Sequence, residues 1–241
     1  MLHADWWETR SGATLATLER CLAVLEALKT EDGEHCVWWH RHPDERYGIA
    51  PPWASAMAQG EAISLYLRLA QALERPSLVD TARRAYRFMD RTVEDGGVRR
   101  HDEQGNLWLE EYPSAEPSLV LNGFVYALLG LYDLHRVGGD ERVKRDIDAA
   151  VATLLARLPD FDAGYWSLYD LQKRELVRYY YQRNVHVPQL AVLERLTGEP
   201  LFGHYRERWE RQLTRRNYLR VQVMYRVRPR LRRLRELRRA G

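Results

Sequence analysis

The stretch Trp108-Leu-Glu-Glu-Tyr-Pro-Ser-Ala-Glu-Pro-Ser-Leu-Val-Leu-Asn-Gly-Phe-Val-Tyr126 contains the two features on which the fold of this chain depends. Its first half is a polar elbow, in which two carboxylates and a phenol stand among large apolar residues and prolines: Glu110, Glu111 and Tyr112. Its second half is apolar at nearly every position, and a helix that is apolar all round is usually buried. We therefore predict a buried central helix over residues 118–136 that is entered through a polar elbow.

A helical hairpin recurs three times, at intervals of roughly 60 residues. Each copy has a mostly apolar helix, a short breaker and an amphipathic helix. The apolar helices are predicted over 53–73, 118–136 and 184–196, and their partners over 78–92, 141–158 and 202–213; a further helix is predicted over 11–29, with Ser11 as its N-cap. Such hairpins cannot bury their apolar faces alone, so they must stack or close into a ring. The repeat predicts an all-α fold, as an α/α toroid or partial (α/α) barrel with short β-strands in its loops.

Charge divides the chain into a body and a tail. Residues 206–241 hold 14 Arg and 3 Glu, a net charge of +11, so residues 1–205 carry −8 of the total of +3. We expect a single domain over 1–216 and an Arg-rich, helical tail over 217–241. Such a tail is typical of segments that contact an acidic polymer, an anionic membrane or a nucleic acid, and a solvated helical extension is the alternative. No specific nucleic-acid partner is expected.

Several protein classes lack support in the sequence. The first eight residues do not show the charged-then-apolar order of a signal peptide, and no apolar run reaches the roughly 18 residues that span a bilayer. We expect a cytoplasmic protein, with attachment to a membrane through the tail as an alternative. A Gly-rich phosphate loop and a Gly-x-Ser-x-Gly elbow are both absent from the sequence, so nucleotide use and serine-hydrolase chemistry are not indicated.

Cysteine and histidine spacing predicts neither disulfides nor a metal site. Two cysteines, Cys21 and Cys36, give no disulfide framework. The alternative is a metal site in the first histidine-rich segment, but its residues match no common zinc spacing: His35, Cys36, His40, His42 and Asp44. We therefore expect no metal.

Polar and aromatic residues gather before the three apolar helices, where a closed ring would place a cleft. The chain has 8 Trp and 14 Tyr against 4 Phe, and these amphipathic rings suit carbohydrate clefts. Two phenols on opposite faces of a carbon acid can remove one proton and return another, although each tyrosine also fits a structural position. The candidates are Trp53, Ser55 and Gln59, then Glu110, Glu111, Tyr112, Asn122 and Tyr126, and finally Ser167, Tyr169, Asp170, Tyr179 to Tyr181 and His186.

Six ordered blocks of the sequence resemble the C-terminal domain of D-glucuronyl C5-epimerases. They are Trp53–Gly60, Trp108–Pro113, Leu119–Phe124, Gly130–Asp133, Ser167–Leu171 and His186–Leu190. The resemblance implies an α/α-barrel domain that needs no cofactor. It also implies conversion of D-glucuronosyl to L-iduronosyl units within a heparosan-like acidic polysaccharide, by removal and re-addition of the C5 proton. The animal relatives suggest a homodimer.

The resemblance also assigns roles to residues. Glu111 and Tyr112 match the Glu-Tyr-Pro active-site pair, and Tyr169 matches the tyrosine of a Tyr-Asp-Leu motif. The last catalytic tyrosine of the family lies four residues before the histidine that matches His186, whereas Tyr181 lies five before it and fits with a one-residue shift. Where the family has an arginine after Tyr-Asp-Leu, this chain has a glutamine that Arg178 or Arg183 would complement. The implied substrate-binding residues are Ser55, Met57, Gln59, Asn122, Tyr126, Gln172, Arg178, Arg183 and His186.

The sequence hypothesis is therefore a polysaccharide C5-epimerase. Tyr169 and Tyr181 form the acid/base pair across C5, and protein donors stabilise the charge that develops on the uronate carboxylate. Tyr112 and Glu111 organise or share one proton. The alternatives are a polysaccharide lyase, a glycoside hydrolase using Glu111 and Asp170 as its carboxylates, and a non-catalytic glycan-binding protein.

Overall fold

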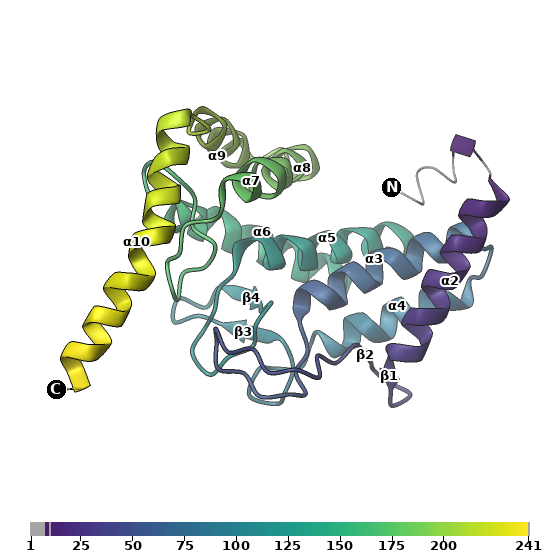
Figure 1. Ribbon diagram of the computed structural model, residues 1–241. Coiled ribbons are helices and arrows are strands. Elements are labelled where there is room, and N and C mark those ends of the chain that lie inside the picture. The colour runs from purple at the N-terminus through teal and green to yellow at the C-terminus, as the bar shows by residue number, and fades with distance from the viewer. Residues whose placement is uncertain (1–7, 10, 241) are drawn as a thin grey trace. The chain divides into compact units, whose positions relative to one another are not determined.

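The computed structural model describes residues 8–9 and 11–240, with side chains as far as residue 227. The N-terminal residues that predict no targeting segment therefore lie mostly outside the described residues, as does Gly241. The chain folds into two compact units, Met1–Ala156 and Arg157–Gly241. Long helices dominate both units (Figure 1), and the named strands are only two or three residues long, which confirms the all-α class. Closure of the hairpins into a toroid and a single domain over 1–216 stay predictions.

The first unit is built on helices joined by two small antiparallel ladders. Its helices are α2 (Gly12–Leu28), α3 (Ala56–Ala72), α4 (Ser77–Phe88), α5 (Leu121–Gly138) and α6 (Glu141–Arg157). The ladders pair β1 (Thr30–Glu31) with β2 (Cys36–Val37), and β3 (Arg99–His101) with β4 (Leu107–Leu109). The predicted helices and the short strands between Asp95 and Trp108 are thus confirmed.

Two glycines let α3 and α5 pack closely side by side as the central pair of the first unit (Figure 1). A Cβ on Gly60 would lie 2.5 Å from the Cα of Ala127, and one on Gly130 would lie 2.4 Å from the Gly60 carbonyl oxygen. Both distances are far below van der Waals contact. The close approach buries Ile63 of α3 and Leu128 of α5 completely, so the pair forms the core as the apolar repeat predicted.

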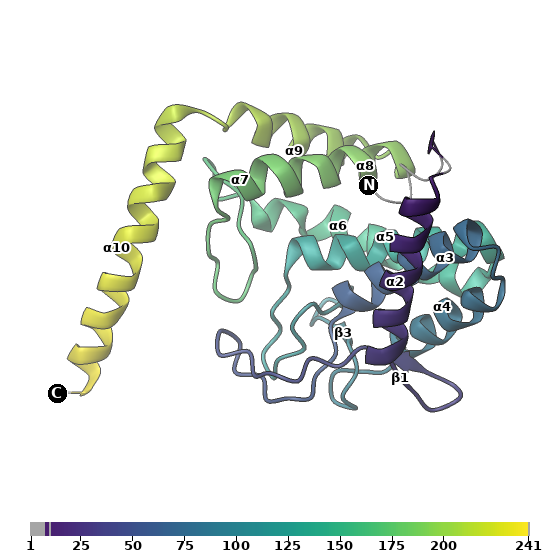
Figure 2. The ribbon, with the colours of Figure 1, turned by 45° about the vertical axis from the view of Figure 1, so that its right-hand side comes forward.

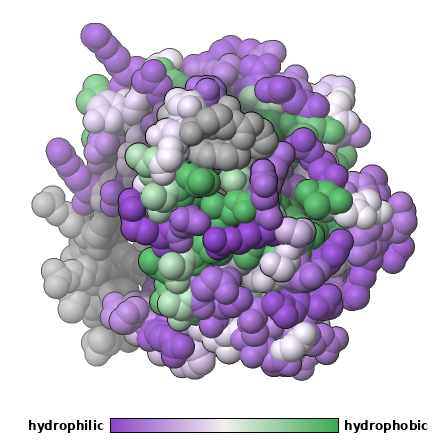
Figure 3. All heavy atoms as spheres, turned by 90° about the vertical axis from the view of Figure 1, so that its right-hand side faces the viewer, coloured by the Kyte–Doolittle hydropathy of each residue, from purple (hydrophilic) through white to green (hydrophobic). Residues whose placement is uncertain are grey.

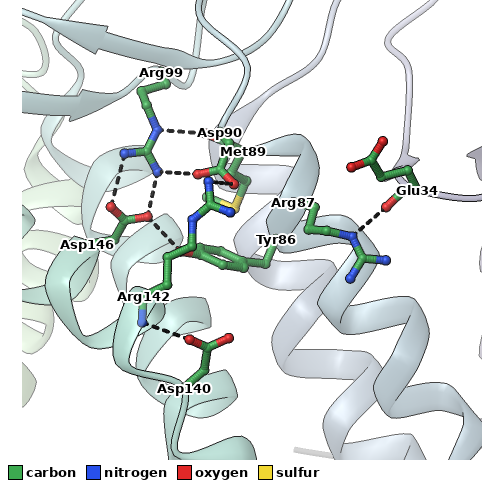
Figure 4. A network of polar contacts seen from close by, with 9 residues as sticks. All are labelled: Glu34, Tyr86, Arg87, Met89, Asp90, Arg99, Asp140, Arg142 and Asp146. Carbon is green, nitrogen blue, oxygen red and sulfur yellow. Dashed lines mark hydrogen bonds and ion pairs between the residues drawn. The ribbon is translucent and has the colours of Figure 1, made fainter.

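A network of ion pairs holds α6 to the end of α4 and to β3 (Figure 4). Arg99 of β3 lies 2.5 Å from the Asp146 carboxylate of α6 and 3.1 Å from the Asp90 carboxylate just after α4. Arg142 of α6 also forms an ion pair with the Asp90 carboxylate, at 2.7 Å. The Tyr86 hydroxyl donates a hydrogen bond to the Asp146 carboxylate at 2.9 Å. Because the shared charges are mostly shielded from water, salt screens them less than ordinary surface pairs.

Three helix boundaries in the first unit differ from the sequence prediction. Helix α3 begins at Ala56 rather than at residue 53, because Ser55 is its N-cap. The central helix begins at Leu121 rather than at residue 118, because Leu119 has a φ of +49°, which no right-handed helix accepts. Helix α4 ends at Phe88 rather than at residue 92. The chain after it turns tightly against Gly97, where a Cβ would lie 2.2 Å from the Arg91 carbonyl oxygen.

The second unit contains the third hairpin. A 3₁₀ turn (Leu158–Phe161) and a loop lead to α7 (Tyr179–Tyr181), a π-helical turn (Gln182–His186) and α8 (Val187–Thr197). Helix α9 (Pro200–Arg211) packs beside α8 (Figure 2). The third apolar helix thus begins at Tyr179, five residues before the predicted start at Asn184.

The Arg-rich segment, which the sequence predicts to be helical, forms helix α10 (Arg215–Ala240). The first half of α10 packs on other residues of the second unit. Val221 is fully buried, and the ring centre of Tyr218 lies 4.8 Å from that of Tyr179. Leu219 and Val223 remain exposed at four-residue spacing. The partner of this helix stays a prediction.

Hydrophilic residues dominate the face of the molecule in Figure 3, with hydrophobic ones gathered toward its middle. Within the described part of the chain, no helix combines the length and the apolar character needed to cross a bilayer.

We predict that Gly60→Ala destabilises the first unit, because the added methyl group collides with the α5 backbone. Overpacking of this kind typically lowers the free energy of unfolding by about 1–3 kcal/mol. The matched control is Gly12→Ala at the first position of α2, where a Cβ meets nothing within 4 Å, and it should raise stability by at most about 1 kcal/mol. Urea unfolding measures both, and equal effects of the two substitutions would contradict the close α3–α5 contact.

Candidate functional site

Glu110 anchors the elbow before α5. Its carboxylate is 1% exposed and accepts hydrogen bonds from Ser118 Oγ at 2.6 Å, Ser118 N at 3.2 Å and Leu119 N at 3.1 Å. Arg100 Nε lies 3.3 Å from its other side. Burial raises the pKa of Glu110, while these donors and the Arg100 charge favour the carboxylate. The Glu110 backbone oxygen also accepts from Ala56 N at 2.9 Å, so this residue fixes the start of α3 as well.

Glu111 is 4% exposed and lies against the first turn of α5. A Cβ at Gly123 would stand 2.2 Å from Glu111 Oε2 and 2.8 Å from its Cδ, so only glycine leaves room for this carboxylate. The neighbouring Asn122 is 3% exposed and directs its Nδ2 toward the sulfur of Met57 at 3.8 Å. The structure thus brings together three predicted site residues from the elbow, α5 and α3.

Tyr112 is half-buried within an aromatic group. Its ring centre lies 4.7 Å from that of Tyr47 and 5.6 Å from that of Trp53. Tyr126, one turn after Asn122 on α5, is also half-buried. Burial, assisted by the nearby Glu61 carboxylate, raises the pKa of the Tyr126 phenol, which therefore acts as a neutral donor.

Two predicted substrate contacts on α3 have structural roles. Ser55 caps the helix, because its Oγ accepts from Ala58 N at 3.4 Å. Gln59 is fully buried; its amide nitrogen donates to the Cys36 carbonyl at 2.9 Å and to the Ala85 carbonyl at 3.2 Å. These bonds join α3 to β2 and α4. Contact of Ser55 or Gln59 with a sugar stays a prediction.

The second unit assembles the tyrosines. The rings of Tyr169 and Tyr181 meet edge to face with centres 5.8 Å apart, and Tyr181 meets His186 edge to face at 5.5 Å. Tyr181 is half-buried, whereas its neighbour Tyr180 is 55% exposed. Two phenols that touch in this way can reach the same small molecule.

The π-helical turn explains the spacing of Tyr181 and His186. In a π-helix the backbone bond runs from residue i+5 to residue i, and here Val187 N donates to the Gln182 carbonyl. The wider turn places residues five apart above one another, which is where Tyr181 and His186 meet. Pro188 favours this turn, because in a regular α-helix its ring would collide with the carbonyl of Asn184. The extra residue relative to the family spacing is thus accommodated without moving Tyr181 away from His186.

A buried polar network fixes this turn from inside. Gln182 is fully buried; its Oε1 accepts from Ser167 N at 2.8 Å and Ser167 Oγ at 2.9 Å, and its Nε2 donates to the Trp209 carbonyl at 3.0 Å. His186 Nδ1 lies 3.0 Å from Ser167 Oγ. Burial lowers the pKa of His186 to about 3, so its imidazole is neutral at physiological pH. His186 therefore positions Tyr181, and its predicted contact with substrate stays a prediction.

The segment after Tyr169 holds the other predicted residues. Asp170 is fully buried and accepts a hydrogen bond from Lys173 N, which makes it part of a tight turn. Gln172 is half-buried in the same turn. Arg178 is exposed, with its guanidinium carbon 6.0 Å from the Tyr225 ring centre on α10, and Arg183 is exposed on the π-turn. Their role toward a carboxylate stays a prediction.

Among the described residues, no three His, Cys, Asp or Glu side chains lie close enough together to hold a metal ion. Burial raises the pKa of Cys36 to about 12, so this thiol is a poor ligand and a poor nucleophile.

Sequence reasoning missed several residues that shape the site: Arg100, Gly123, Tyr47, Gln182 and Pro188. The Gln182–Ser167 bonds join residues 15 apart in the chain, and no periodicity signals them. Pro188, by contrast, was readable, because a proline five residues inside a predicted helix indicates a disturbed turn.

Residues 30–211 match a protein family described as D-glucuronyl C5-epimerase C-terminus. A D-glucuronyl C5-epimerase from Caenorhabditis elegans is 34% identical over 184 residues, which cover 68% of this chain and 30% of that protein. An uncharacterized protein of Methanocaldococcus jannaschii, MJ1128, is 26% identical over 176 residues, which cover 72% of this chain and 56% of that protein. The chain therefore matches less than two thirds of either relative's length.

We predict that Gly123→Ala displaces the Glu111 side chain. The strain should appear as a coupling of about 1–3 kcal/mol in a double-mutant cycle with Glu111→Gly, a range usual for residues in contact. Urea unfolding of the four proteins gives the cycle. Additive effects of the two substitutions would show that Gly123 does not shape the position of Glu111.

We predict that His186 makes the protein acid-sensitive. Its folded-state pKa lies below the unfolded value, so the unfolded chain binds a proton that the folded chain rejects, and stability falls as the pH drops below about 6.5. Between about pH 7 and about pH 5, this site should cost about 2 kcal/mol. His186→Gln, which cannot titrate, should lose that much less over the same interval. Parallel acid sensitivity of the two proteins in urea unfolding would contradict the assignment.

Proposed function

This chain belongs to the D-glucuronyl C5-epimerase C-terminal family, and from that premise we propose that it inverts C5 of uronosyl units within an acidic, heparosan-like polysaccharide. The family points to a carbohydrate epimerase. The observation that carries the finer proposal is the paired placement of phenols beside ordered polar groups. Tyr112 directly follows Glu111, whose carboxylate fits against Gly123. The Tyr181 ring contacts those of Tyr169 and His186 at the π-helical turn.

The proposed reaction is a proton exchange at carbon. The C5–H bond breaks, its electron pair moves toward the uronate carboxylate, and a proton returns to C5 from the other face. The carboxylate is already anionic, so the barrier is high and donors must stabilise the added charge. No atom other than hydrogen is exchanged, which balances the step without an oxidant or reductant.

We assign the proton transfers to Tyr169 and Tyr181. One phenol must start as phenolate to accept the C5 proton, and the other starts neutral to deliver one. Because the two rings touch, the sugar carbon must lie beyond their edges rather than between their faces. From the family resemblance alone we propose that Tyr112 and Glu111 organise or share a further proton and that Asn122 holds the sugar.

The uronate carboxylate needs a cationic or polar partner. The family's arginine is replaced by Gln172, and the exposed Arg178 and Arg183 on the approach to the π-turn are the proposed substitutes. Of these, Arg183 is the stronger candidate, because Arg178 already lies over the Tyr225 ring.

The discriminating assay is incubation of the protein with heparosan in deuterated water. Deuterium at C5 together with L-iduronate supports the epimerase. An unsaturated uronate, formed when the same intermediate expels the group at C4, would instead identify a lyase. New reducing ends without unsaturation would identify a hydrolase.

We predict that single Phe substitutions separate the two proton transfers. Tyr169→Phe and Tyr181→Phe should each abolish inversion, and the variant that keeps the abstracting phenol should still place deuterium at C5 of D-glucuronate. The matched control is Tyr180→Phe, an exposed neighbour whose loss should leave inversion unchanged. Undiminished inversion in either of the first two variants, measured by NMR of the product, would refute the roles assigned here.

A further inference from the structure

A row of neighbouring aromatic rings runs from Tyr112 to the surface of the first unit. The Trp53 ring centre lies 5.6 Å from that of Tyr112, and the His40 ring stacks on Trp53 at 4.1 Å with an angle of 12° between the planes. Tyr112 is half-buried, Trp53 is buried and His40 is exposed. The row therefore begins at a residue of the proposed site and ends in solvent.

The row is rigidly built. His40 and Trp53 exchange backbone hydrogen bonds of 2.8 and 3.1 Å, and the Trp53 indole nitrogen donates to the His42 carbonyl at 2.9 Å. The backbone bonds hold the two residues side by side, and the indole bond holds the Trp53 ring on which His40 stacks, which lowers the entropy lost on binding. Desolvation by partial burial lowers the pKa of His40, so an uncharged flat ring is presented at neutral pH.

We propose that His40 is the platform of an outer sugar-binding subsite, which stacks on the pyranose next to the one held at Tyr112. One face of the imidazole is covered by Trp53, while the residue as a whole is exposed. A flat, weakly polar face suits the apolar face of a sugar ring. The proposal rests on the proposed function for the class of polymer.

The chemistry of the row favours a sugar over a charged ligand. The segment around His40, residues 38–49, contains two Arg against one Asp and one Glu, so it has no net charge to attract an anion by itself. Trp53 already satisfies its indole nitrogen within the protein. What the row offers a ligand is therefore stacking area rather than ion pairing.

The test compares binding of a heparosan octasaccharide and a disaccharide by calorimetry. His40→Ala should weaken octasaccharide binding about 3- to 10-fold, the usual scale of one aromatic contact, and leave disaccharide binding unchanged. His40→Phe, which keeps a flat ring, should bind within about twofold of the wild type. The matched control is His101→Ala, an exposed histidine of β3 outside the row.

Each outcome separates the subsite from the reaction. Octasaccharide binding that His40→Ala leaves intact, or that His40→Phe loses equally, overturns the subsite even if inversion proceeds. Binding with the predicted pattern but without deuterium at C5 upholds the subsite and overturns the proposed epimerase. Thermal unfolding of each variant confirms that any loss of binding occurs in folded protein.

Discussion

The first unit depends on the burial of one carboxylate. Taking a carboxylate out of water costs several kcal/mol, which only a full set of partners offsets. At Glu110 those partners are the hydrogen-bond donors of Ser118 and Leu119 and the charge of Arg100, while its carbonyl receives the first amide of α3. One residue thereby sets the starts of both central helices. Glu111 and Tyr112 directly follow Glu110 in the chain. The buried Glu110 therefore also fixes the position of these two proposed site residues.

The same residue shows where sequence reasoning stops. Apolar spacing predicted that α3 and α5 exist and that both are buried, because burial of a helix depends on its own side chains. The start of α5 was misplaced because the Glu110 carboxylate draws Ser118 and Leu119 out of the helix. Gln59 illustrates the same limit, since no sequence pattern signals its bonds to the Cys36 and Ala85 carbonyls.

The third helix extends this lesson to the site itself. Three consecutive tyrosines followed by polar residues have no helical period, so the sequence placed the helix start after them. The structure instead continues the helix through a wide turn, with Gln182 turned inward to Ser167 and Trp209. A one-residue departure in spacing would rotate Tyr181 by about 100° in a regular α-helix. In the π-turn the additional residue is absorbed, and the Tyr181 ring stays in contact with His186.

Burial sorts the polar residues of the sequence into two kinds. Glu110, Gln182 and His186 are at most 1% exposed, and their partners are protein groups, so they position their neighbours. Tyr112, Tyr169 and Tyr181 are half-buried, and the ring of each packs against at least one other aromatic ring. A phenol that must exchange protons with a sugar needs this intermediate state, because full burial would block the substrate and full exposure would leave the ring free to move. The half-buried tyrosines, rather than Glu110, Gln182 and His186, are therefore where the proton transfers at C5 are expected.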